Sequence, residues 1–283
     1  MRCLRFFVPA LGFALLLFVD VGRAIPLAVA QTKPNPPVRR IYVANLASNE
    51  VTSYSMDGTR ISPTIKGLHV PIGLAVDATG KIYVGNTSTS TVTTYLPDGR
   101  PAKPTITSGV NQPYGLAVDA NGKIYVSNFG DNTLTTYKAD GTRTTPTITG
   151  LDSPHGVAVD AQGNIYVVNA GNQSVSVYSA SGTKTATITY GVSAPRNIAV
   201  DDQGKIYVVN SRSAEVTTYN PDGSRTPPTI REGLHAPYGV AVNGAIFVGN
   251  YSRGTLQTYS KDGKHISPTI TGLSEPVGLA IAR

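Results

Sequence analysis

The stretch PYGLAVDANGKIYVSN, residues 113–128, decides the fold of this chain. It holds two short runs of β-branched and aromatic residues joined by the turn Asp119–Gly122, the pattern of two adjacent antiparallel strands. The run Ile-Tyr-Val recurs at steps of 40–42 residues, beginning at Ile41, Ile82, Ile124, Ile165 and Ile206, and returns as Ile-Phe-Val at Ile246. A fixed period of this length indicates a solenoid or a propeller.

The content of the repeat favours the propeller. Each unit reads Gly-Leu-Ala-Val-Asp, a turn, Ile-Tyr-Val-x-Asn, a loop, Val-Thr-Thr-Tyr, an Asp-Gly turn and then Pro-Thr-Ile, with no helical spacing. The Asp-Gly dipeptides are hairpin turns between the third and fourth strands, and Ser181-Gly182 is their variant. Four consecutive antiparallel strands make one propeller blade. The predicted fold class is therefore all-β: a six-bladed β-propeller of four-stranded antiparallel blades.

The fourth strand of each unit is predicted to be the exposed outer edge of its blade. Proline removes an N–H group and so prevents an edge strand from pairing further. Five of the six repeats carry a proline there: Pro63, Pro104, Pro146, Pro228 and Pro268.

The two ends of the repeat region predict how the ring closes. The region enters at a second strand, beginning at Ile41, and stops after a first strand, Gly278–Ala282. We therefore expect the C-terminal strand to complete the blade that begins at Ile41. The propeller is assigned to residues 41–283.

Residues 1–30 are predicted to be a cleaved signal peptide. Two arginines precede the apolar run Phe6–Val19, which is too short to cross a bilayer as a helix, and Ala28-Val29-Ala30 offers a cleavage pattern. Cleavage after Ala24 and an uncleaved anchor are the alternatives. Residues 31–40 follow as a Pro-rich extended arm. The mature protein is then expected to be secreted or periplasmic, with no membrane span.

Composition excludes several classes of function. The chain has 24 Lys and Arg against 17 Asp and Glu, a net charge of +7 that is spread along the sequence, which disfavours a nucleic-acid surface. Its single cysteine, Cys3, excludes disulfides and Cys-ligated metals from the mature chain. HExxH, P-loop, GxSxG and dinucleotide motifs are missing from the sequence.

The combination of Ile-Tyr-Val-x-Asn with Pro-x-Gly-Leu-Ala-Val-Asp-x-x-Gly-Lys resembles the NHL-repeat propellers and the related YVTN repeats, across residues 41–283. Two features depart from the NHL pattern: Asn ends the second strand where Asp is common, and the letters Asn-His-Leu are missing. The resemblance implies a protein-interaction, sensor or ligand-binding domain. A minority of similar propellers are lyases or lactonases with a metal at the central channel. Function must still be argued from the site.

Comparison of the six repeats separates framework from candidate site residues. Eleven of the 15 tyrosines occupy two shared repeat positions, so we interpret them as packing between blades. The Asn that closes Ile-Tyr-Val-x-Asn and the Asp of the D-x-x-G turn recur in the same way. We interpret this Asn as bonding its own backbone where the loop begins, and this Asp as a turn former.

The residue between Pro and Gly in Pro-x-Gly varies from blade to blade. It begins the innermost strand and is expected near the channel axis, and around the ring it is Val277, Ile72, Tyr114, His155, Arg196 and Tyr238. Asn197 replaces the following Gly in one repeat, and nearby loops add Phe129, Arg212, Tyr251 and Arg253. An apolar wall facing a few polar groups is typical of a ligand pocket. The alternative is that these side chains simply plug the channel.

Two functions remain open on this evidence. The first is a non-catalytic scaffold that binds a protein partner or a small anionic or polar ligand at this face, without a cofactor. The alternative is a lyase or hydrolase in which Arg196 holds an anion, His155 acts as base and Tyr114 or Tyr238 as acid. A divalent metal on the alternate-blade residues His69, Asp152 and His235 is a further hypothesis.

Overall fold

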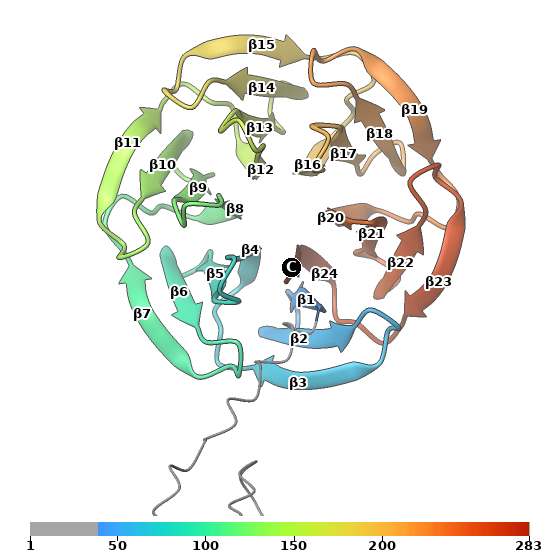
Figure 1. Cartoon of the computed structure of the whole chain (residues 1–283), viewed down its shortest axis with the longest axis horizontal. Helices are drawn as coiled ribbons and strands as arrows, with labels where there is room; N and C mark the ends of the chain where they lie inside the picture. Colours follow the sequence, from blue (N-terminus) through green and yellow to red (C-terminus); the bar gives the residue numbers. More distant parts are fainter. Residues whose placement is uncertain (1–38, 283) are drawn as a thin grey trace, which may run out of the picture. The chain divides into compact units, whose positions relative to one another are not determined.

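The repeats form strands because their runs of Val, Ile, Thr and Tyr fit a pleated, half-buried surface. In the computed structural model, which describes residues 39–282, every repeat forms four antiparallel strands, and the six sheets stand in a ring around a central channel (Figure 1). The predicted six-bladed β-propeller is therefore confirmed. No helix in this part of the chain is long and apolar enough to span a membrane.

The strands of the six blades fall into four classes, from the channel outward. The innermost strands are β24 (Pro276–Ile281), β4 (Pro71–Val76), β8 (Pro113–Val118), β12 (Pro154–Val159), β16 (Pro195–Val200) and β20 (Pro237–Asn243). The second strands are β1 (Arg40–Asn45), β5 (Ile82–Asn86), β9 (Ile124–Asn128), β13 (Ile165–Asn169), β17 (Ile206–Asn210) and β21 (Ala245–Asn250).

The third and fourth strands complete each blade toward its outer edge. The third strands are β2 (Glu50–Ser55), β6 (Thr91–Tyr95), β10 (Thr133–Tyr137), β14 (Ser174–Tyr178), β18 (Glu215–Tyr219) and β22 (Thr255–Tyr259). The outermost strands are β3 (Arg60–Ile65), β7 (Pro101–Ile106), β11 (Arg143–Ile148), β15 (Lys184–Ile188), β19 (Arg225–Ile230) and β23 (His265–Ile270).

The ring closes through the C-terminal strand, as the sequence predicted. One sheet has the order β24-β1-β2-β3, and its pairing places Ile41 opposite Ile281 and Val43 opposite Leu279. Strands from the two ends of the repeat region thus share one blade. Opening the ring would require breaking this ladder as well as the packing between blades.

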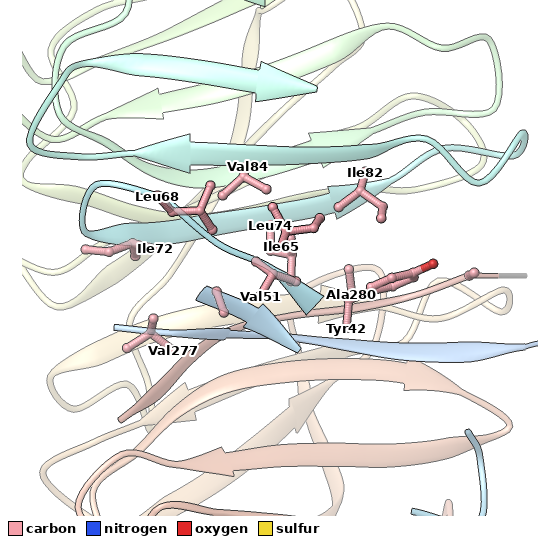
Figure 2. Close-up of a cluster of buried hydrophobic side chains, with 12 residues drawn as sticks. Tyr42, Val51, Ile65, Leu68, Ile72, Leu74, Ile82, Val84, Val277 and Ala280 are labelled. Carbon is pink, nitrogen blue, oxygen red and sulfur yellow. The ribbon is translucent and has the colours of Figure 1, made fainter. Parts of the chain in front are cut away.

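The hydrophobic core lies between neighbouring blades. In the cluster drawn in Figure 2, Tyr42 and Val277 of the first blade pack with Ile82 and Leu74 of the second. The Ile-Tyr-Val strands are buried on both faces, and the framework tyrosines Tyr83, Tyr125 and Tyr207 are at most 2% exposed. Because each blade covers the next, the repeated residues build the ring, and the variable residues are free for other roles.

The D-x-x-G turns confirm the predicted role of their aspartate. In the second blade, Asp77 Oδ1 accepts the backbone N–H groups of Thr79 and Lys81 at 2.8 and 3.0 Å. Its Oδ2 accepts the Tyr83 hydroxyl at 3.0 Å, and burial together with this carboxylate raises the pKa of the Tyr83 phenol. The carboxylate is thus committed to the turn and to the framework tyrosine.

The recurring asparagine makes the predicted bond to its own backbone in four blades, as from Asn45 Nδ2 to the Val43 carbonyl at 3.1 Å, and it also has a second role. Asn210 is fully buried, and its Oδ1 accepts the backbone N–H of Ser193, 17 residues earlier, at 2.8 Å. Its Nδ2 donates to Thr217 of the third strand at 2.9 Å, and only a longer bond of 3.4 Å goes to the nearby backbone at Val208. The side chain therefore ties the loop before the innermost strand to the sheet, a contact distant in sequence.

Candidate functional site

The variable Pro-x-Gly residues surround one mouth of the central channel. Each begins an innermost strand, so six strand starts bring six side chains toward the axis. Five of them line a cavity of about 390 Å³, which we call the mouth pocket. Its lining residues are Leu46, Ile72, Tyr114, Arg196, Ser211, Ala236, Tyr238, Tyr251 and Val277. This volume lies within the range of small-molecule sites.

The mouth pocket has an apolar side and a polar side. Leu46, Ile72 and Val277 come from the first two blades and form the apolar wall. Tyr238 and Tyr251 of the sixth blade lie with their ring centroids 6.1 Å apart. Aliphatic and aromatic surfaces joined to a few polar groups suit a ligand with an apolar body.

Arg196 supplies the positive charge of the pocket. Its side chain is half-buried, and its guanidinium carbon lies 5.7 Å from the centroid of the Tyr238 ring. Among residues 39–282, no carboxylate lies within 4.0 Å of this guanidinium, whereas Arg231 and Lys261 are paired with acids. A guanidinium that no carboxylate occupies can bind a carboxylate or phosphate in a bidentate geometry. The pocket thus presents a fixed cation whose only aromatic or ionic contact within the described chain is the Tyr238 ring.

His155 lies beneath the mouth pocket. It is 3% exposed and is not among the pocket-lining residues. The ring contacts Tyr114 at 4.7 Å and Phe129 at 5.7 Å between centroids, and Tyr238 Oη lies 3.4 Å from its Nδ1. Burial, with a smaller contribution from the positive charge of Arg196, lowers the pKa of His155 to about 3. The imidazole is therefore neutral at physiological pH.

The aromatic side chains close the channel below the pocket. Tyr114 stacks on Phe129 at 4.6 Å, and both contact His155. Since His155 also reaches Tyr238 across the ring, residues of three blades meet in this plug. A small cavity of about 50 Å³ lies deeper in the channel, lined in part by Leu74 and Leu116. The sequence left a plug and a pocket as alternatives. In the structure the pocket lies at the mouth of the channel and the plug lies below it.

Other candidate residues separate by position. Tyr251 lines the mouth pocket, whereas Asn197 lines the deeper cavity and accepts the backbone N–H of Ile198 at 2.8 Å. Arg212 and Arg253 are exposed and lie outside the pocket lining. Their place in the loop differs from that of Tyr251: Arg212 and Arg253 stand two and three residues after the repeat asparagine, whereas the pocket residues Leu46, Ser211 and Tyr251 directly follow it.

Three pocket residues were missed in the sequence: Leu46, Ser211 and Ala236. Leu46 and Ser211 occupy the same repeat position as Phe129 and Tyr251, directly after the asparagine of Ile-Tyr-Val-x-Asn. That shared position is the signal that identifies them. Ala236 precedes the proline of Pro-x-Gly and carries no chemical group that would single it out.

The hypothetical metal residues do not come together. Within residues 39–282, no group of three His, Cys, Asp or Glu side chains is arranged to hold a metal ion. The backbone N–H groups of His69, Asp152 and His235 instead donate to framework asparagines at 2.9–3.2 Å. Their shared position in the repeat therefore serves the loop before each innermost strand.

A wider cavity of about 660 Å³ lies at the other end of the innermost strands. Its lining includes one partly exposed aliphatic side chain from every blade: Val76, Val118, Val159, Val200, Val242 and Ile281. The turn aspartates at this rim bind backbone N–H groups and tyrosine hydroxyls. Four blades contribute the same Val-Asp pair to this lining, so we interpret it as framework.

These observations define the molecule as a six-bladed β-propeller with a lined pocket at one mouth of its channel. Residues 151–178, from the loop before β12 to the end of β14, match the family model of the NHL repeat. The resemblance to the NHL repeat is thereby confirmed for this segment, which is one of the six repeats. Among curated proteins, no sequence matches this chain.

Solved structures share this fold at low sequence identity. A chain in the crystal structure of a nidogen/laminin complex superposes with a TM-score of 0.75 at 20% identity, covering 87% of this chain and 98% of that one. A protein of unknown function from Bacteroides caccae gives 0.71 at 14% identity, covering 87% and 99%. Staphylococcus aureus virginiamycin B lyase with quinupristin gives 0.64 at 13% identity, covering 84% of each chain. Such identities establish the common fold and leave function to the site.

Proposed function

We propose that this protein is an exported binding scaffold that takes an anionic group into the mouth pocket. The observation that carries the proposal is Arg196, a half-buried guanidinium without a carboxylate partner among the described residues, in a pocket with one apolar wall. A carboxylate or phosphate would accept two parallel hydrogen bonds from it. The group belongs either to a small molecule or to a side chain of a partner protein.

Two further points support binding over catalysis. A general base works best with a pKa near the operating pH, and the pKa of about 3 makes His155 a weak base. It is also buried below the pocket, where Tyr114 and Tyr238 separate it from the cavity. The virginiamycin B lyase shares the propeller fold, but these residues offer a lyase mechanism little support.

The fold is compatible with an anion that belongs to a partner protein. A propeller of the same architecture is part of the nidogen/laminin complex, so this ring is compatible with protein binding. The loops around the pocket add exposed Arg212 and Arg253, residues of a type enriched in interfaces. A partner that inserts an acidic side chain would contact both the pocket and these loops.

Ligand binding can be tested by thermal shift with acetate, benzoate, inorganic phosphate and an acidic peptide. A site filled at 100 times its Kd adds about 2.7 kcal/mol to the unfolding free energy, or about 5–10 °C in Tm. We expect this shift to vanish in Arg196→Gln and to persist in Arg143→Gln, a matched exposed arginine on the outer strand β11. An equal shift in both variants would refute a role for Arg196.

Export belongs to the same proposal and concerns residues 1–30, which lie outside the described part of the structure, as does the proposed arm except Arg39 and Arg40. The test is expression of the full chain in a bacterial host, followed by fractionation and N-terminal sequencing of the product. A mature N-terminus at Gln31 or at Ile25 would support cleavage after Ala30 or Ala24. Retention of Met1 in the cytoplasmic fraction would refute export.

A further inference from the structure

Five of the six outer edges are interrupted in the same way. In each, an advance of two residues along the third strand corresponds to four residues along the outer strand. In the third blade, for example, Leu134 pairs with Ile148 and Thr136 pairs with Thr144. A proline stands within each such segment of the outer strand: Pro63, Pro104, Pro146, Pro228 and Pro268. The predicted position of these prolines on the outer strands is thus confirmed, and such edges resist the addition of another strand.

The outer strand β15 of the fourth blade lacks this interruption. It is one residue shorter than the other outer strands, and Ala186 takes the place of the proline. Ile188, Thr187 and Ala186 pair consecutively with Val175, Ser176 and Val177 of β14, followed by a one-residue bulge. Figure 1 shows β15 on the outer rim of the ring, with no further strand beyond it. Its edge therefore offers backbone N–H and C=O groups in a more regular row.

An exposed aromatic residue stands at the end of this edge. Tyr190 is 75% exposed, the highest value of any large hydrophobic residue in the described chain. Its position is fixed, since its carbonyl accepts the Tyr219 hydroxyl at 2.9 Å and the Arg225 guanidinium lies 5.7 Å from its ring centroid. The corresponding residue of the second blade is Ser108. Exposed tyrosines of this kind serve as anchors in interfaces.

Positive charge predominates on β15 and its own hairpin. Asp222 of the neighbouring blade adds one carboxylate near the end of β15, because its neighbour Gly223 packs against Ile188. The segment 161–200 contains no Asp or Glu, and the hairpin before β15 has Ser181 where five other blades have Asp. Lys184 begins the strand and Arg225 lies beside Tyr190 at its far end. Neither cation has a carboxylate within 4.0 Å among residues 39–282. An occupant with acidic residues at both ends would complement this edge, whereas a second basic copy of the chain would not.

We propose that the edge of β15 docks an extended acidic segment of a partner protein as a fifth strand of the blade. Main-chain hydrogen bonds to β15 would provide the attachment, a known mode of peptide recognition. Lys184 and Arg225 would select acidic residues at the two ends of the segment, and Tyr190 would cover its last residues. This surface lies on the outer rim and is independent of the mouth pocket.

The test uses the purified full chain and a fluorescent heptapeptide, EVTVTVE, with blocked ends, followed by anisotropy. We expect saturable binding that is at least tenfold weaker for the matched peptide KVTVTVK and weaker at high salt. Ala186→Pro gives β15 the residue of the other five blades and should weaken binding at least tenfold. Lys184→Glu and Tyr190→Ala should each weaken it several-fold. Lys103→Glu, on the proline-bearing strand β7, is the matched control and should leave binding unchanged.

Three results would overturn the proposal. The first is an absence of binding at millimolar peptide, because strand addition through the backbone does not depend on one particular sequence. The second is equal binding by the wild type and by Ala186→Pro, Lys184→Glu and Tyr190→Ala. The third is a wild-type dimer in sedimentation velocity that Ala186→Pro converts to monomer, which would assign the edge to a second copy. Circular dichroism of each variant shows whether it is folded.

Discussion

Because His155 is buried and neutral in the folded protein, we predict that the protein loses stability below neutral pH. The imidazole is 3% exposed and surrounded by Tyr114, Phe129 and Tyr238, with the positive Arg196 nearby. Its pKa is about 3 in the folded protein, against the ordinary value of 6.5 expected after unfolding. Between these values the unfolded chain binds a proton that the folded chain does not. The free energy of unfolding therefore falls as the pH is lowered through this window.

The size of the effect follows from the two pKa values. At pH 7.5 both states are neutral at this residue and the contribution is complete. At pH 5 the loss is about 2 kcal/mol, and at pH 4 it is about 3 kcal/mol, since each unit is worth about 1.4 kcal/mol. For a ring of this size, 2 kcal/mol corresponds to about 4–8 °C in Tm. The carboxyls with lowered pKa, such as Asp98 and Asp140, contribute only near and below pH 4.

The assay is urea unfolding or calorimetry at pH 5.0 and 7.5 for wild type, His155→Phe and His69→Gln. Phenylalanine keeps an aromatic ring in the plug but cannot take up a proton, so this variant should lose most of the pH dependence. His69 is exposed, and its variant should behave like wild type. If His155→Phe and wild type lose the same stability between pH 7.5 and 5.0, a buried neutral His155 is not the cause and the reasoning is wrong.

Three further changes test the framework. Gly115→Ala places a Cβ against the carbonyl oxygen of His155, well inside van der Waals contact, and should lower the unfolding free energy in urea by about 3 kcal/mol. Asn210→Ala leaves the part-buried N–H of Ser193 without its acceptor and should cost about 1 kcal/mol by the same measurement. Val70→Gly relieves a β-branched residue at φ 53° and should raise Tm by up to about 4 °C in calorimetry, whereas a lower Tm would show that no strain is relieved there.

The sequence predicted the location of the candidate site better than the set of residues that line it. Internal repetition placed the Pro-x-Gly residues at one end of the innermost strands, and five of the six line the mouth pocket. The same comparison passed over Leu46 and Ser211, because apolar and small side chains in a loop carry no chemical signal. It also included Arg212 and Arg253, which are exposed and lie outside the pocket lining.

The sequence by itself determined the strand order, the number of blades and the closure of the ring. These properties depend on local patterns, namely a period of 40–42 residues, alternating turns and the strand types at the two ends. Only the tertiary structure decided that Arg196 faces the pocket while His155, at the same repeat position, is buried below it. The physical reason is that a repeat position fixes where a Cβ atom lies on its strand. The depth and ionisation of the side chain depend on the residues that meet it across the channel, such as Tyr238, 83 residues away from His155.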